Sequence, residues 1–247
     1  MTDVRALDVD LALMSEAVYE RPWTAAVSFM ETNAGRARHG RWSLVQEFDH
    51  AGSQAALFHD VDGERDWAIV FRGTEAQRKH VRDIAANAGY PTGWAGPGLA
   101  HSGYASYLAR VGDRARRFAD RVPNDARLHV TGQSMGGAIA TLYSAWVLTA
   151  ADENAHRIFS VSTYGSPKPL SGTGCRALRA AAQRRGTQIR QFVIPMDFAP
   201  YWPPSITFQN PGPEVRLPSP TWWPGPVTRH APRMYVRAAA AAYDAGR

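Results

Sequence analysis

One tight turn between an apolar strand and an apolar helix constrains the fold of this chain more than any other feature. Residues 128–131 have the apolar and β-branched composition of a strand, and residues 138–148 have that of a buried helix. Between them lies Gly-Gln-Ser-Met-Gly, a G-x-S-x-G motif centred on Ser134. Such a turn strains the serine backbone and leaves no room for side chains at Gly132 and Gly136. The motif therefore predicts a strand, a tight turn and a helix in that order.

The same turn places Ser134 where a catalytic nucleophile is needed. It lifts the hydroxyl to the carboxyl end of the sheet, above the N-terminus of the following helix. There the backbone N–H of Met135 can face the negative charge that develops on a carbonyl oxygen under attack. A glycine turn whose serine only caps the helix is the structural alternative. The flanking strand and helix favour the catalytic interpretation.

Strands and helices alternate along the rest of the chain. We expect helices at 7–19, 104–121, 175–185 and 232–243, and strands at 42–48, 55–61, 67–71, 157–164, 189–194 and near 205–209. Residues 195–232 are rich in proline and tryptophan and are expected to be irregular. No repeat or linker divides the chain. We therefore predict that residues 1–247 form a single α/β domain with a mostly parallel central sheet flanked by helices.

Composition excludes several other classes of protein. Hydrophobic residues make up 45% of the chain and charged residues 20%, as in soluble globular proteins. The longest nearly apolar run, residues 138–151, is too short to cross a membrane. Cys175 is the only cysteine, so no internal disulfide or cysteine-ligated metal is expected. The first residues lack the pattern of a secretory signal, so we expect a cytoplasmic protein, with export by a signal-independent route as the alternative.

The positive charge is the other notable property of the composition. The net charge is +6 and the isoelectric point about 9.8, and arginine supplies nearly all of the positive charge. A compositional bias towards arginine explains this, and attraction of the arginines in 176–190 to anionic lipid is the functional alternative. No motif for DNA or RNA binding is present, so no specific nucleic-acid partner is expected.

A serine nucleophile needs a base, and the base needs an acid that orients it. In α/β-hydrolases, which have this type of turn, the acid and then the histidine follow the serine. Asp197 directly follows the expected strand 189–194, at the same sheet edge as Ser134, and His230 is the only histidine after it. We therefore predict that Asp197 and His230 are the acid and the base, rather than the polar loop 152–156. An ordinary turn aspartate and an ordinary loop histidine are the alternatives.

A second donor for the developing oxyanion is expected where another strand reaches the same edge. The continuously apolar strand 67–71 ends in Arg72-Gly73-Thr74. The N–H and hydroxyl of Thr74 can therefore join the N–H of Met135. These residues alone are equally consistent with an ordinary turn that ends a strand.

The series of motifs resembles the fungal-type, or class 3, lipase family of the α/β-hydrolase superfamily. The matching segments are LALMSEAVY (11–19), VFRGT (70–74), HSGY (101–104), VTGQSMGGAIATL (130–142), TYGSPKP (163–169) and DFAPYWPP (197–204), followed by His230. They occur in the family's order and span most of residues 7–235.

The resemblance implies catalytic roles for five residues within or after the matching segments. It implies Ser134, Asp197 and His230 as the catalytic triad, Thr74 and Met135 as the oxyanion hole, and residues 75–93 as a lid over the acyl pocket. It also implies a substrate that is an acylglycerol, a phospholipid or another carboxylic ester, without any metal or organic cofactor. A carboxylesterase for small soluble esters, a lipid acyltransferase and a non-catalytic lipid-binding relative are the alternatives.

The chain departs from the family pattern in ways that affect the site. Gln133 stands where the family commonly has histidine, and Met135 where it commonly has leucine. The first half of the expected lid is polar, with arginine, lysine and histidine between residues 77 and 82. Such a lid argues against strong interfacial activation on neutral fat. Tryptophans in loops at the expected site end can supply peripheral contact with a membrane or lipid interface instead: Trp94, Trp202, Trp222 and Trp223.

Overall fold

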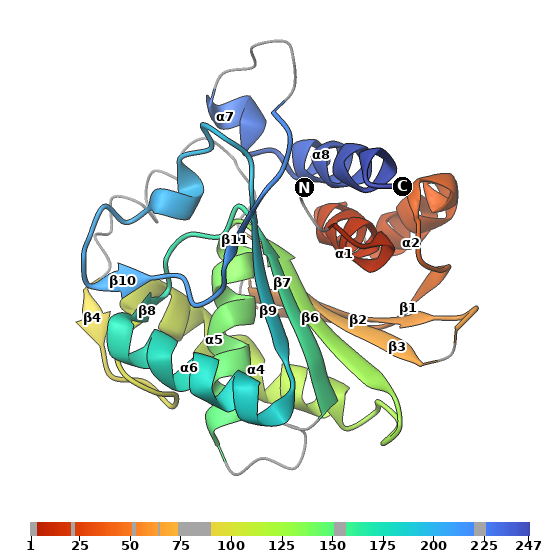
Figure 1. Cartoon of the computed structure of the whole chain (residues 1–247). Coiled ribbons are helices and arrows are strands. Elements are labelled where there is room, and N and C mark those ends of the chain that lie inside the picture. The colour runs from red at the N-terminus through yellow and green to blue at the C-terminus, as the bar shows by residue number, and fades with distance from the viewer. Residues whose placement is uncertain are drawn as a thin grey trace.

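A twisted central sheet separates two layers of helices (Figure 1). The computed structural model describes residues 4–20, 23–50, 53–63, 65–73, 90–150, 157–219 and 226–247. Within these residues the sheet has seven strands, in the order β1-β2-β3-β6-β7-β9-β11. Their bounds are β1 Trp42–His50, β2 Ser53–Asp60, β3 Asp66–Phe71, β6 Arg127–Gln133, β7 Ile158–Tyr164, β9 Gln188–Val193 and β11 Glu214–Arg216.

The predicted mostly parallel sheet is confirmed. β1, β2 and β3 pair in antiparallel fashion, and every pairing from β3 through β6, β7 and β9 to β11 is parallel. β3 and β6 run in register from Asp66 opposite Arg127 to Phe71 opposite Gly132. The carboxyl ends of β3 and β6 therefore meet at one edge, where the G-x-S-x-G turn begins.

Helices cover both faces of the sheet, as Figure 1 shows. One face packs against α4 (Ser102–Ala119), α5 (Met135–Thr149) and α6 (Gly172–Arg185), and the other against α1 (Ala6–Ala17), α2 (Trp23–Thr32) and α8 (Pro232–Ala245). Side chains of β3 alternate between the two layers, with Ile69 and Phe71 in the first and Ala68 and Val70 in the second. A strand buried on both faces must be apolar throughout, which explains the unbroken run 67–71.

Short elements complete the fold, and one of them confirms a prediction: β10 (Phe208–Gln209) is the strand expected near 205–209. The expectation that the rest of residues 195–232 is irregular is wrong in part, because these residues also contain η3 (Ala199–Tyr201), β11 and α7 (Pro226–Arg229). β11 extends the central sheet by pairing with β9, a contact that no local pattern indicates. The other short strands are β4 (Pro91–Thr92), β5 (Ala100–His101) and β8 (Leu170–Ser171), which form a small second sheet with β10. Pro91 and Thr92, at the end of the expected lid, thus belong to this second sheet.

α2 was not expected from the sequence, whereas the other long helices lie close to their predicted positions. None of the helices in the described part of the chain is long and apolar enough to cross a membrane.

The N-terminus of α5 approaches the sheet closely enough to contact its backbone. A Cβ atom at Gly136 would lie 2.1 Å from the carbonyl oxygen of Phe71 at the end of β3. At Gly132 it would lie 2.4 Å from the carbonyl carbon of Gly136. Real Cβ atoms do not approach backbone this closely, so α5 can occupy this position only with glycine at both sites.

We predict that Gly136→Ala destabilises the protein by about 3 kcal/mol or more, because the added methyl group must push α5 away from β3. Gly35→Ala is the matched control, since a Cβ at Gly35 meets nothing within 4 Å. Urea unfolding measures both variants. Equal stability of Gly136→Ala and the parent protein would contradict the close approach.

Candidate active site

Ser134 lies at the sharp junction between β6 and α5. Its φ is +57°, in the left-handed region that residues other than glycine rarely adopt. The backbone is held on both sides: the Ser134 N–H donates to the carbonyl oxygen of Tyr164 at 2.9 Å, and its own carbonyl accepts from Gly137 at 3.0 Å. The strained conformation expected from the motif is therefore present and fixed by hydrogen bonds.

The three residues predicted as nucleophile, acid and base come together. His230 Nε2 lies 2.6 Å from Ser134 Oγ, and His230 Nδ1 lies 2.8 Å from Asp197 Oδ2. With the imidazole proton on Nδ1, the ring donates to Asp197 and accepts from the Ser134 hydroxyl. Serine, histidine and aspartate thus form one hydrogen-bonded chain, with the base in position to take the serine proton.

Asp197 is buried and accepts hydrogen bonds on both of its carboxylate oxygens. Only 1% of the residue is exposed. Its Oδ1 accepts from the Ala199 N–H at 2.9 Å, and its Oδ2 accepts from the Tyr235 hydroxyl at 2.6 Å as well as from His230. These donors satisfy a carboxylate that is shielded from water and hold it in one orientation.

Tyr235 is a site residue that the sequence analysis missed. It projects from α8, is fully buried, and its oxygen also accepts from the Ile194 N–H at 3.4 Å. Burial, followed by the negative charge of Asp197, raises the pKa of Tyr235 well above its ordinary value. The hydroxyl therefore keeps its proton and remains a donor to Asp197. In the sequence, the only signal for this role is that Tyr235 lies five residues after His230, in the expected terminal helix.

Gln133 has a positioning role that its polarity alone did not indicate. Its Nε2 donates to the backbone carbonyl of His230 at 2.6 Å, and its Oε1 accepts from the Tyr19 hydroxyl at 2.9 Å. Burial is the main reason why the pKa of Tyr19 is raised, so Tyr19 also stays a donor. The Arg72 guanidinium lies over the Tyr19 ring, 5.4 Å from its centroid. The residue next to the nucleophile thus joins the base to the segment that follows α1.

The expected oxyanion residues are placed only in part. Met135 is the first residue of α5, directly after Ser134. Thr74 lies outside the described residues. The residue before it, Gly73, is in contact with the turn, because a Cβ there would lie 3.0 Å from the Gln133 carbonyl oxygen. The end of β3 therefore reaches the nucleophile as expected.

The structure describes only part of the expected lid and only some of the tryptophans expected at the site. Residues 75–89 of the lid, and Trp222 and Trp223, lie outside the described residues. Trp94 is not at the site: it lines a separate cavity of about 480 Å³ together with Tyr90 and Trp146. Because Trp146 lies near the C-terminal end of α5 and Ser134 precedes its N-terminus, the Trp146 side of this cavity is roughly 18 Å along the helix from Ser134.

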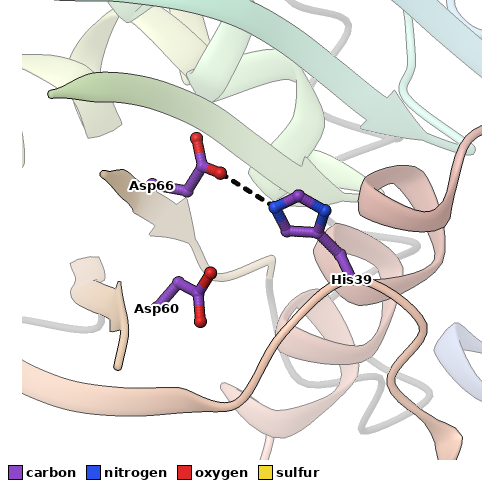
Figure 2. Close-up of side chains that lie close together, drawn as sticks. All are labelled: His39, Asp60 and Asp66. Atoms are coloured by element: carbon purple, nitrogen blue, oxygen red, sulfur yellow. Dashed lines mark hydrogen bonds and ion pairs between the residues drawn. The ribbon is translucent and has the colours of Figure 1, made fainter. Parts of the chain in front are cut away.

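A group of titratable residues at the opposite end of β3 is the one candidate for metal binding among the described residues. His39, Asp60 and Asp66 have ligand atoms within 4.8 Å of one another, and Figure 2 shows the His39 imidazole directed at Asp66. Each Asp66 oxygen already accepts two hydrogen bonds: Arg127 supplies two at 2.7 Å, His129 one at 3.0 Å and His39 one at 2.8 Å. These fill the lone pairs of the carboxylate, so the arrangement suits a protonated imidazole rather than a metal ion.

The hydrogen bond to Asp66 raises the pKa of His39, against the opposing effect of partial burial. Burial opposes ionisation of Asp66 as well, but the hydrogen bonds from His129, His39 and Arg127 outweigh it and lower the pKa of that carboxyl. The cluster therefore contains an ionised Asp66 that is stabilised by Arg127 and by two imidazoles, of which His129 has its pKa lowered by burial.

Comparison with known proteins identifies a family whose sequence profile matches this chain and solved structures that share its fold. The sequence profile of the family described as Lipase (class 3) matches residues 68–206, more than half of the chain. No curated protein matches the sequence significantly.

Solved structures of fungal lipases share the fold at low sequence identity. The Rhizopus microsporus var. chinensis lipase is 16% identical, with a TM-score of 0.63 over 85% of this chain and 72% of that one. Lipase II from Rhizopus niveus is 18% identical, with a TM-score of 0.66 over 87% and 80%. The Rhizomucor miehei triacylglyceride lipase is 20% identical, with a TM-score of 0.65 over 88% and 82%.

We predict that Tyr235→Phe lowers kcat about three- to tenfold and leaves KM within about twofold, because one of the donors that orient Asp197 is lost while substrate contacts remain. Tyr243→Phe, on the same helix, is the matched control. Steady-state kinetics on a dissolved ester, with thermal unfolding alongside, measures the effect. A change confined to stability would assign Tyr235 a purely structural role.

We predict that His39→Gln makes stability less dependent on pH. Because the His39 pKa is raised in the folded state, its contribution is complete below the ordinary histidine pKa of about 6.5 and is lost as pH rises through the raised value. The parent should exceed the variant by about 0.5 kcal/mol at acidic pH, and the difference should shrink above neutrality. Urea unfolding across pH tests this; a difference that grows with pH would contradict it.

Proposed function

Since the chain belongs to the class 3 lipase family of the α/β-hydrolase superfamily, we propose that it cleaves carboxylic ester bonds of lipids through an acyl-enzyme on Ser134. The observation that supports this mechanism best is the continuous hydrogen-bonded chain Ser134–His230–Asp197, at 2.6 and 2.8 Å. Both distances are within the range expected of a nucleophile, a base and an orienting acid.

In the first half of the proposed reaction, His230 Nε2 takes the hydroxyl proton as Ser134 Oγ attacks the ester carbonyl carbon. The imidazolium that forms lies against the Asp197 carboxylate, which stabilises its charge and keeps the ring in place. Collapse of the tetrahedral intermediate breaks the ester bond, and His230 returns the proton to the departing alcohol oxygen. The acyl group is then bonded to Ser134 Oγ.

In the second half, water replaces the alcohol. His230 removes a proton from the water as its oxygen attacks the acyl carbon, and Ser134 Oγ leaves with a proton from His230. The products are the carboxylic acid and the free enzyme. No oxidant, metal or organic cofactor is needed for this balance.

The oxyanion of both intermediates is proposed to be bound by the backbone N–H of Met135 and by Thr74. Support comes from the position of Met135 at the start of α5, because a helix N-terminus favours a negative charge, and from the contact of Gly73 with the turn. Removing one donor of this kind typically costs about two to three orders of magnitude in rate.

For the substrate we propose an acylglycerol or a phospholipid cleaved at an acyl ester. A basic chain with a net charge of +6 favours lipid surfaces that carry negative charge, and the polar first half of the segment 75–93 does not suit strong activation by neutral fat.

We expect Ser134→Ala to lower ester hydrolysis by a factor on the order of 10⁴ or more, because the attacking oxygen is lost. Ser144→Ala, which removes only a buried hydrogen bond within α5, is the matched control and should stay active. Fatty-acid release from dissolved short-chain esters, triacylglycerol emulsions and phospholipid vesicles measures both variants and identifies the preferred substrate. Activity that survives in Ser134→Ala would disprove the mechanism.

A further inference from the structure

The segment that joins β9 to β10 exposes an unusual number of large apolar side chains. Four of the eight exposed large hydrophobic residues in the described part of the chain lie within residues 196–206. They are Met196, Phe198, Tyr201 and Ile206, which we term the 196–206 rim, with exposed fractions of 55, 45, 47 and 97%. Isolated exposed apolar residues are common, but such concentration in one short segment marks an interaction surface.

The sequence of the segment keeps this surface free of charge. Residues 198–213 contain no Asp, Glu, Lys, Arg or His, although charged residues make up 20% of the whole chain. The acid inside the rim, Asp197, is buried and bonded to His230 and Tyr235. No charged side chain of the segment itself would therefore have to lose its hydration when the rim enters an apolar medium.

Burial of one residue and hydrogen bonds to backbone carbonyls hold the backbone of the rim in place. Ala199 is buried, and Pro200 accepts a hydrogen bond from the Asn210 side chain at 3.3 Å. The Trp202 carbonyl accepts from the Lys168 N–H at 2.7 Å. The exposed side chains thus project from an anchored backbone, so little conformational entropy is lost when they bind.

The rim is continuous with the catalytic residues. The Phe198 ring lies 5.9 Å from the His230 ring, centroid to centroid. In Figure 1 the segment between β9 and β10 lies on the same side of the molecule as α7, which precedes His230. Phe198 therefore joins the exposed rim to the residue that bonds Ser134.

We infer that the 196–206 rim is the surface through which this protein enters a lipid layer, so that acyl lipid with anionic headgroups is its binding partner. The inference rests on the proposed hydrolysis of lipid esters and names the part of the chain that meets their surface. Uncharged aliphatic and aromatic side chains, one of which contacts the His230 ring, supply the insertion, and the net charge of +6 supplies attraction from a distance.

The test is binding of Ser134→Ala protein, which cannot consume the lipid, to vesicles. Flotation is measured with phosphatidylcholine vesicles and with equimolar phosphatidylcholine and phosphatidylglycerol. Adding Tyr201→Ser and Ile206→Ser should lower the partition coefficient on both vesicles by about tenfold or more, because two inserted apolar side chains are lost. Val45→Ser with Leu99→Ser is the matched control: both residues are exposed apolar positions outside the rim. It should change binding by no more than about twofold.

Hydrolysis of a dissolved short-chain ester, measured with Ser134 restored, separates the two proposals. We expect the rim double variant to retain this activity, because no hydrogen bond or ring contact among the described residues joins Tyr201 or Ile206 to Ser134, Asp197 or His230. If the parent hydrolyses no ester but binds vesicles through the rim, the proposed function fails and the rim inference stands. Unchanged flotation of the rim variant, or an equal loss in the control, overturns the rim inference. So does binding that depends only on phosphatidylglycerol and not on the rim.

Discussion

The structure depends on a contact between backbones, in which the N-terminus of α5 presses against the carboxyl ends of β3 and β6. Glycine at 132 and 136 makes this contact possible, since any Cβ there would overlap main-chain atoms. The contact also determines the position of Ser134. It forces Ser134 into the left-handed region at the sheet edge and places the end of β3, with Arg72 and Gly73, beside it. The positions of Ser134 and of the end of β3 beside it thus follow from one steric constraint.

The proposed base, His230, and the proposed acid, Asp197, are held by elements on the other face of the sheet. Tyr19, just after α1, bonds Gln133, which in turn bonds the His230 backbone. Tyr235, on α8, bonds Asp197. Tyr235 is buried and Tyr19 is half-buried, and loss of solvent around each hydroxyl raises its pKa, so both stay protonated as donors. Each helix layer therefore positions different side chains. α5 fixes Ser134, whereas the layer of α1 and α8 orients His230 and Asp197.

Sequence reasoning placed elements and side chains correctly where one local constraint determines their position. The turn at Ser134, the apolar run of β3 and the chain order of Asp197 and His230 each restrict the possibilities without knowledge of distant contacts. It failed where the partner is remote in sequence. β11 is a strand only because Glu214–Arg216 can pair with β9, and Tyr235 is a site residue only because α8 packs beneath Asp197. The role of Gln133 was hidden for the same reason, since its partners are more than ninety residues away.

Because Tyr19 follows α1 and Tyr235 lies on α8, the geometry of the site depends on the docking of these two helices. α1 and α8 pack against each other, and Figure 1 shows them side by side on one face of the sheet. A chain in which the sheet and α5 have formed, but in which this pair of helices has not docked, has a nucleophile without an aligned base. The same chain would have Asp197 without its Tyr235 partner. The proposed hydrolysis therefore requires α1 and α8 to be docked, and a chain that lacks this docking would keep Ser134 at its turn without the means to use it.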